Sequence, residues 1–196
     1  MPKVIRFTLG IFLNVCDMNI SKFIFNKILG WKIVGYFNEE EIKKVVIIVA
    51  PHTSWSDFYI AILCRKTLGV MINFVGKKEL FTWPFGYYFR WVGGAPLDRS
   101  TNQNKVDAIA SIFDSKEEFR LGMSPEGTRK KVDKWRTGFY YIALKANVPI
   151  MPASMDYKTK TITIGDIFYP TGAIEPDLKF LKEFFIGSVG KVEKYT

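Results

Sequence analysis

The stretch KVVIIVAPHTSWSD, residues 44–57, decides the fold because a buried strand ends in it and a polar loop begins. Residues 44–50 are short, continuous and rich in β-branched side chains, which is typical of a strand covered on both faces. The chain continues with His52, its single histidine, and reaches Asp57 five positions later. In sheets of parallel strands, functional groups gather beyond the carboxyl ends of the strands. The stretch therefore predicts a site directly after this strand.

Strands and helices are expected to alternate along the rest of the chain. Short apolar or β-branched runs indicate further strands within residues 70–75, 93–99, 119–124, 149–157 and 161–168. Helical spacing indicates helices up to about Leu68 and within residues 77–93, 102–118, 137–147 and 177–187, with Pro84 interrupting the first of these ranges. This alternation predicts an α/β fold: a single domain with a mixed, largely parallel sheet flanked by helices.

An N-terminal amphipathic helical segment is expected at residues 1–35, ahead of the main domain at residues 36–196. It contains two short helices broken near residues 17–19, and the second has an apolar face made of Ile20, Phe23, Ile24, Ile28 and Trp31. No apolar run reaches the roughly 18 residues that a membrane-spanning helix needs. Aromatic and lysine side chains on such helices suit a membrane interface, and the pattern fits helices packed on the domain equally well.

The charge balance favours anionic partners. The net charge is +9 and the pI is near 9.4, which suits nucleic acid, acidic lipid surfaces or phosphorylated ligands, although composition alone favours a generally basic surface. No nucleic-acid-binding signature accompanies the charge, so we expect no nucleic acid partner. The two cysteines, Cys16 and Cys64, form no disulfide framework, and the single histidine argues against a structural zinc site. Both are expected to be reduced core residues of a cytosolic protein.

The spacing of His52 and Asp57 limits how the two side chains can meet. Five residues on a regular helix turn by about 500°, so the side chains would not share a helix face. They can meet if His52 lies in the loop and Asp57 in the first helical turn, where the carboxylate fixes one imidazole nitrogen and leaves the other free to take a proton. Ser54 suggests a hydrolase instead, but the G-x-S-x-G pattern is absent, so Ser54 is expected to cap the helix or line a pocket.

Three further motifs are weak when taken singly. GGAPLDRS, residues 93–100, combines glycines that allow close backbone approach with Arg99, which can grip a phosphate. SPEGTRKK, residues 124–131, predicts a tight turn that displays Glu126, Thr128 and Arg129 to a hydroxyl and a phosphate. VPIMPASM, residues 148–155, is apolar and fits a wall rather than chemistry. Each motif also fits an ordinary surface turn or strand.

Taken in order, HTSWSD, GGAPLDR, PEGTR and VPIMP resemble the four motifs of the glycerolipid acyltransferase family, which includes the lysophosphatidic acid (1-acylglycerol-3-phosphate) acyltransferases. The resemblance covers about residues 45–155, and the His-x4-Asp and Pro-Glu-Gly-Thr-Arg motifs together are quite specific. It identifies residues 36–196 as an acyltransferase domain. It implies phospholipid biosynthesis at a membrane, with the protein cytoplasmic and peripheral on the inner face.

The resemblance also implies a mechanism and site residues. His52 would be the general base and Asp57 its orienting partner, together the catalytic pair, in direct acyl transfer to the hydroxyl of a lysophospholipid. The donor would be an acyl thioester of coenzyme A or acyl carrier protein, and no cofactor or metal is implied. Arg99 would hold the acceptor's phosphate. The acceptor or the site's alignment would also depend on Glu126, Gly127, Thr128 and Arg129.

Several positions depart from the family pattern. Pro51 stands where Asn is common, Ser124 where Phe is common and Lys130 where Ser is common, while residues 95–97 are less bulky than usual. These departures leave the base and its orienting partner intact and leave the acceptor open. A lyso-amino-acid lipid is therefore an alternative acceptor. A second alternative is a basic membrane-surface binding protein without catalysis.

Overall fold

A seven-stranded sheet forms the centre of the structure, a computed structural model that describes residues 18–97 and 105–196. Its strands are β1 (Lys32–Val34), β2 (Lys44–Ala50), β3 (Asn73–Lys77), β4 (Gly94–Leu97), β5 (Phe119–Met123), β6 (Ile150–Asp156) and β7 (Thr161–Ile164). Their spatial order is β1-β7-β6-β2-β5-β3-β4. All neighbouring pairs are parallel except β6 and β7, which are antiparallel. The expected mixed, largely parallel sheet is confirmed.

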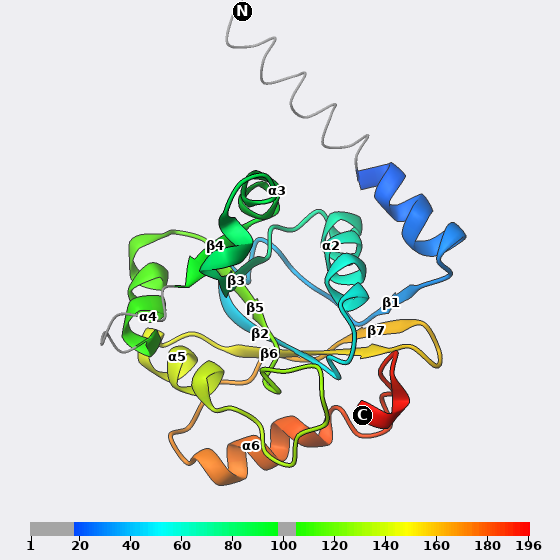
Figure 1. The fold of residues 1–196 in the computed structure, drawn as a ribbon. Coiled ribbons are helices and arrows are strands. Elements are labelled where there is room, and N and C mark those ends of the chain that lie inside the picture. The colour runs from blue at the N-terminus through cyan, green and yellow to red at the C-terminus, as the bar shows by residue number, and fades with distance from the viewer. Residues whose placement is uncertain (1–17, 98–104) are drawn as a thin grey trace, which may run out of the picture.

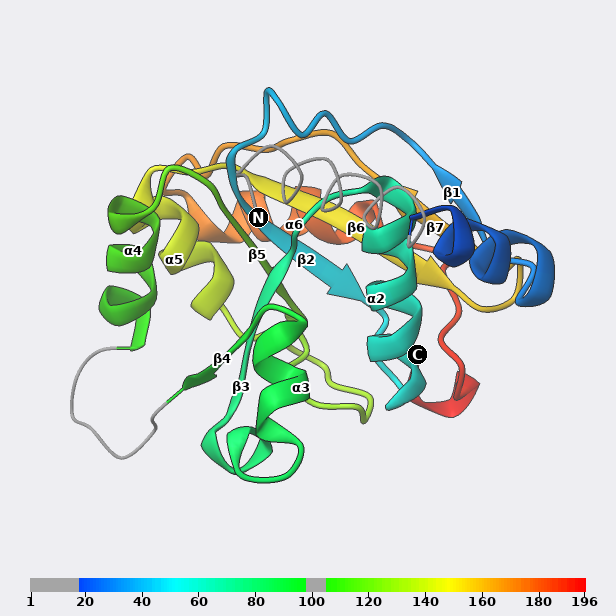
Figure 2. The same cartoon turned by 90° about the horizontal axis from the view of Figure 1, so that it is seen from above.

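Helices cover both faces of this sheet (Figures 1 and 2). One face carries α2 (Ser56–Leu68), α3 (Gly86–Trp91) and the helical segment that begins at Met18 and ends in the π-helix η1 (Ile24–Ile28). The other face carries α4 (Lys105–Ser115), α5 (Gly138–Ala146) and α6 (Ile174–Glu183). Two short 3-10 helices complete the described elements, η2 (Lys78–Phe81) and η3 (Glu193–Tyr195).

The burial of β2 explains its uninterrupted apolar sequence. Successive side chains of a strand point to opposite faces of its sheet. Val46 and Ile48 therefore join the core beneath α4, α5 and α6, whereas Val45 and Ile47 face the layer that contains α2. Because β5 and β6 flank β2 on either side, the strand lies in the middle of the sheet and its carboxyl end is surrounded by other strand ends. This is the place where the sequence predicts a site.

The interruption expected at Pro84 is confirmed: residues 77–93 contain η2 and α3, and Pro84 lies in the turn between them, where a missing backbone N–H is tolerated. Other details differ from the predicted elements. The last helix begins at Ile174 rather than at residue 177. Strand β1 was not expected, because three residues give no usable alternation and the strand exists by pairing with β7.

The segment from residue 18 to β1 is partly built into the fold. Phe25 and Trp31 are buried against Ile60 and Met155. Trp31, predicted on the apolar face of the second helix, is therefore part of the core. Other members of that face, such as Phe23, remain exposed. The first of the two expected N-terminal helices lies outside the described residues. Among the residues that are described, no helix combines the length and the apolar character needed to cross a membrane.

Candidate active site

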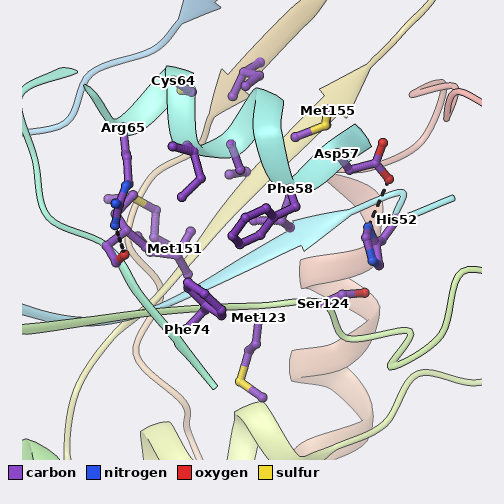
Figure 3. Close-up of a pocket in the computed structure, with 18 of the residues that line it drawn as sticks. His52, Asp57, Phe58, Cys64, Arg65, Phe74, Met123, Ser124, Met151 and Met155 are labelled. Carbon is purple, nitrogen blue, oxygen red and sulfur yellow. Dashed lines mark hydrogen bonds and ion pairs between the residues drawn. The ribbon is translucent and has the colours of Figure 1, made fainter. Parts of the chain in front are cut away.

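The structure brings His52 and Asp57 together at the carboxyl end of β2. The strand ends at Ala50 and α2 begins at Ser56, so His52 lies in the loop and Asp57 in the first helical turn. Nδ1 of His52 is 2.9 Å from Oδ2 of Asp57, and the side chains are 30% and 4% exposed, respectively (Figure 3). Within the described part of the chain, no residue forms a hydrogen bond with the other ring nitrogen, Nε2. The imidazole is thus anchored on one side and accessible on the other.

Asp57 is held by hydrogen bonds on both of its oxygens. Besides His52, Oδ2 accepts the backbone N–H groups of Thr53 (2.9 Å) and Ser54 (2.8 Å), and Oδ1 accepts the hydroxyl of Tyr157 (2.7 Å). Burial alone would raise the pKa of this carboxyl. The hydrogen bonds from His52, Tyr157 and Ser54, together with the charge interaction with His52, outweigh that effect and bring the pKa below its ordinary value. Asp57 is therefore ionised at neutral pH.

Glu126 holds the backbone of the same loop. Its Oε2 accepts the N–H of His52 at 2.6 Å and the hydroxyl of Ser124 at 3.3 Å, and its carboxyl is buried. Burial raises the pKa of Glu126, although these hydrogen bonds oppose the shift. The turn that carries it depends on Gly127, whose φ is +63° and whose position leaves no room for a Cβ beside Arg136. Glu126 thus points at the backbone of His52, and a contact with the acceptor stays a prediction.

The remaining predicted residues are not drawn into this hydrogen-bond network. Thr128 is half-buried and its hydroxyl accepts the N–H of Lys130, whereas Arg129 is exposed. Arg99 lies outside the described residues, so its role also stays a prediction. The strand that precedes Arg99, β4, runs in the same direction as β3, β5 and β2. The chain therefore leaves β4 at the edge of the sheet where β2 ends and His52 follows. Ser54 is buried, and its hydroxyl accepts hydrogen bonds from Ser56.

A cavity of about 310 Å³ extends from His52 between α2 and the sheet. His52, Asp57 and Ser124 lie at one end, and Arg65 lies at the other (Figure 3). The walls between them are apolar and include Ile47, Ala61, Ile62, Phe74, Met123 and Met151. Arg65 is almost fully buried, and its Nη1 donates to the carbonyl oxygen of Ile72 at 2.6 Å. The polar groups around His52 therefore open into a space that suits a hydrocarbon chain.

Two contributors were missed from the sequence: Tyr157 and Arg65. Tyr157 directly follows β6, the strand next to β2, so its position at a strand end was an available signal. Arg65 carried no such signal, because a basic residue late in a helix is ordinary. Across residues 18–97 and 105–196, no group of three or more His, Cys, Asp or Glu side chains is placed to share a metal ion.

Comparisons with known proteins place the chain in one family. The sequence model of the family described as Acyltransferase matches residues 33–156. The chain is 33% identical over 135 residues to the 1-acyl-sn-glycerol-3-phosphate acyltransferase of Streptococcus pneumoniae, a match covering 65% of this chain and 50% of that protein. It is 30% identical over 97 residues to the Escherichia coli protein of the same name, covering 46% and 40% of the two chains. The chain thus spans about half the length of the curated relatives it matches, or less.

A solved structure shows the same fold. The crystal structure of the 1-acyl-sn-glycerophosphate (LPA) acyltransferase PlsC from Thermotoga maritima superposes with a TM-score of 0.62. The match covers 91% of this chain and 79% of that one, at 22% sequence identity.

Proposed function

Because the chain belongs to the acyltransferase family, we propose that it moves a fatty acyl group from an acyl thioester to the hydroxyl of a lysophospholipid such as 1-acylglycerol-3-phosphate. One observation carries the proposal: an imidazole held by a buried, ionised carboxylate at the mouth of an apolar cavity. The names of the relatives favour the same reaction and acceptor.

The geometry of His52 suits a general base. An ionised carboxylate only accepts hydrogen bonds, so Nδ1 of His52 carries the proton that Asp57 accepts and Nε2 carries a lone pair. Nε2 takes the proton of the acceptor's hydroxyl while that oxygen attacks the thioester carbonyl. The new C–O bond forms, the C–S bond breaks, and the departing thiolate receives the proton from the imidazolium. Asp57 stabilises the imidazolium charge, and Glu126 fixes the loop backbone.

The cavity behind His52 accommodates the acyl chain in this proposal. Its walls are apolar over most of their length, and burial of each CH2 group contributes about 0.8 kcal/mol. Binding the chain in the cavity places the thioester carbonyl at the polar end, beside His52 and Ser124. Arg99 and Arg129 bind the acceptor's phosphate in this proposal, and Gly127 and Thr128 shape the acceptor's side of the site. The donor is an acyl thioester of coenzyme A or of acyl carrier protein.

Membrane contact is assigned to the α3 aromatic surface, which consists of the exposed side chains of Trp83, Phe85, Tyr87 and Trp91. Tryptophan and tyrosine favour the boundary between hydrocarbon and water, and the net charge of +9 suits the anionic cytoplasmic leaflet. The surface is near the cavity, because Phe58, a cavity wall, contacts Phe89 of α3 with ring centroids 5.9 Å apart. A lysolipid in the bilayer would therefore lie beside the site.

The proposed reaction is tested by thiol release from a long-chain acyl-CoA, with and without lysophosphatidic acid, using wild type and His52→Ala. We expect release that depends on the acceptor and is lost in the variant. Release without an acceptor would identify a thioesterase. If acyl carrier protein donors and lyso-amino-acid lipids also give no transfer, the chain is a non-catalytic lipid-binding protein and the proposal fails.

A further inference from the structure

We propose that Tyr157 and residues 189–192 act as a C-terminal brace, a positioning element that holds Asp57 and the loop before α2 in the geometry that orients His52. This inference rests on the proposed role of His52 as the base, and it adds a segment of chain outside the four motifs to the active site.

Tyr157 fixes the side of Asp57 that the loop leaves open. Its hydroxyl donates to Oδ1 at 2.7 Å and lies 3.2 Å from the hydroxyl of Ser56. Its ring packs edge-on against the buried Trp31, with centroids 4.9 Å apart, so the phenol has little rotational freedom. Because the loop amides and His52 all use Oδ2, Tyr157 is the partner that sets the plane of the carboxylate.

Residues 189–192 connect Tyr157 to the loop. The N–H of Tyr157 donates to the carbonyl oxygen of Val189 (2.8 Å), and the N–H of Val189 donates to the carboxylate of Asp156 (3.0 Å). The N–H of Val192 donates to the hydroxyl of Thr53 at 3.1 Å. Figure 1 shows this C-terminal part of the chain (red) beside the loop that enters α2.

Two more contacts complete the brace on the loop. Nζ of Lys191 donates to the hydroxyl of Ser56 at 3.1 Å, so the loop is held both before and after Trp55. The backbone approaches closely at Gly190, where a Cβ would lie 2.5 Å from Cγ2 of Thr53. Within the described residues, no side chain from 189–196 belongs to the clusters of apolar side chains that form the core on the two faces of the sheet. The segment therefore contacts the loop before α2 and Tyr157 rather than the core.

The brace also affects the pKa of Asp57, because several titratable groups surround its carboxylate. Facing it are His52, the phenol of Tyr157 and, more remotely, the carboxyl of Glu126, while Lys191 approaches through Ser56. The hydrogen bond from Tyr157 lowers the pKa of Asp57. Removing that donor takes a hydrogen bond away from the charged carboxylate, so the pKa of Asp57 should rise in a variant without the hydroxyl.

The test compares Tyr157→Phe and Gly190→Ala with the matched controls Tyr169→Phe, an exposed tyrosine, and Gly138→Ala, a glycine with open space around it. We expect kcat to fall about tenfold in Tyr157→Phe and less in Gly190→Ala, with KM unchanged, because a charge-assisted hydrogen bond and loop position are altered rather than a substrate contact. The acid limb of the pH profile of kcat/KM should move to higher pH in Tyr157→Phe and stay in place in the controls.

A second readout does not need activity. The single histidine gives one pair of imidazole NMR signals, and the Nδ1–H proton should shift and exchange faster in Tyr157→Phe and Gly190→Ala. Wild-type kcat, pH profile and imidazole signals in both folded variants would overturn the brace. If Tyr157→Phe does not fold, wild-type kcat, pH profile and imidazole signals in Gly190→Ala and Lys191→Ala would overturn the brace instead. Failure of wild type to transfer acyl groups would overturn the proposed function and leave the NMR result interpretable.

Discussion

The carboxylate of Glu126 lies 2.6 Å from the backbone nitrogen of His52, although the two residues are 74 positions apart in sequence. The contact forms because β5, which precedes Glu126, is the neighbour of β2, which precedes His52. The Pro-Glu-Gly-Thr-Arg turn therefore holds the backbone of the histidine loop, whatever further contact it makes with a substrate.

Replacing Glu126 should separate hydrogen bonding from charge. Glu126→Ala leaves the partly buried N–H of His52 without its acceptor, so we expect the free energy of unfolding to fall by about 1–3 kcal/mol and transfer to fall strongly. Glu126→Gln keeps an acceptor oxygen and should retain much of both. Urea unfolding and kcat measure the two effects, and equal behaviour of the two variants would contradict a hydrogen-bonding role.

The raised pKa of Glu126 gives a pH dependence with a definite sign. A group whose pKa is raised on folding stabilises the protein most below its ordinary pKa, here 4.5, and this contribution is lost as pH rises through the folded-state value. The free energy of unfolding of wild type should therefore decrease relative to Glu126→Gln as pH rises above 4.5. The pKa of Asp57 is lowered on folding, so its contribution to the free energy of unfolding is lost as pH falls below 3.8. Both proteins contain Asp57, so this loss is common to wild type and Glu126→Gln.

Asp57→Asn should weaken His52 as a base while leaving its tautomer in place. The backbone N–H groups of Thr53 and Ser54 donate to the same oxygen that His52 contacts, so the amide oxygen of Asn keeps that position and still accepts Nδ1–H. The neutral amide no longer stabilises the imidazolium that forms when Nε2 takes a proton, and we expect a loss of transfer of about a hundredfold or more. Nitrogen-15 NMR of the single imidazole checks that the tautomer is retained. Full activity of the folded variant would rule out a role for the carboxylate charge.

Filling the cavity should shorten the accepted acyl chain. Ala61 lies on α2 in the cavity wall, one helical turn before Arg65 and one after Asp57, so Ala61→Phe would remove space in the cavity. Each CH2 group that no longer fits forfeits about 0.8 kcal/mol, so two should shift donor preference by roughly tenfold. Competition between acyl-CoA donors of different length measures the preference. The control, Ala173→Phe, makes the same change at an exposed position and should leave the preference unaltered.

The α3 aromatic surface should govern binding to lipid vesicles. Trp83→Ala combined with Trp91→Ala removes two exposed rings, and binding to anionic vesicles should weaken by tenfold or more, since each buried aromatic contributes about 1.5–3 kcal/mol. Turnover of short, soluble substrates should be preserved. Vesicle sedimentation compares this variant with Ile186→Ala, which removes an exposed apolar side chain elsewhere. Equal vesicle binding by both variants would assign the membrane contact to another surface.

Local sequence determined the central elements well. The β-branched run at residues 44–50 matches β2 residue for residue, and α2 ends at the expected Leu68. The meeting of His52 and Asp57 was also accessible, because a short spacing with one residue in a loop leaves few arrangements. The order of the four motifs indicated the family, and the match of the acyltransferase family model to residues 33–156 confirms it.

Contacts that depend on tertiary neighbours were beyond the sequence. Tyr157 reaches Asp57 across 100 positions because β6 lies beside β2, a fact of strand order that no local pattern encodes. The cavity is equally non-local, since its volume is what remains after side chains from the sheet and α2 have packed. Strand β1 was missed because its stability comes from β7 rather than from its own three residues.

The adjacency of β6, β2 and β5 has a consequence for how such a chain can diversify. Glu126 and Tyr157, which contact the loop of His52 and its carboxylate, follow β5 and β6 at the same edge of the sheet at which β2 ends, whereas these parallel strands begin at the far edge. Loops on that far edge can gain or lose residues at little cost to the reaction centre. Asp57 lies in the first turn of α2, so the later turns of this helix and the cavity beneath them can change to fit a different apolar ligand while the hydrogen bonds around His52 are kept.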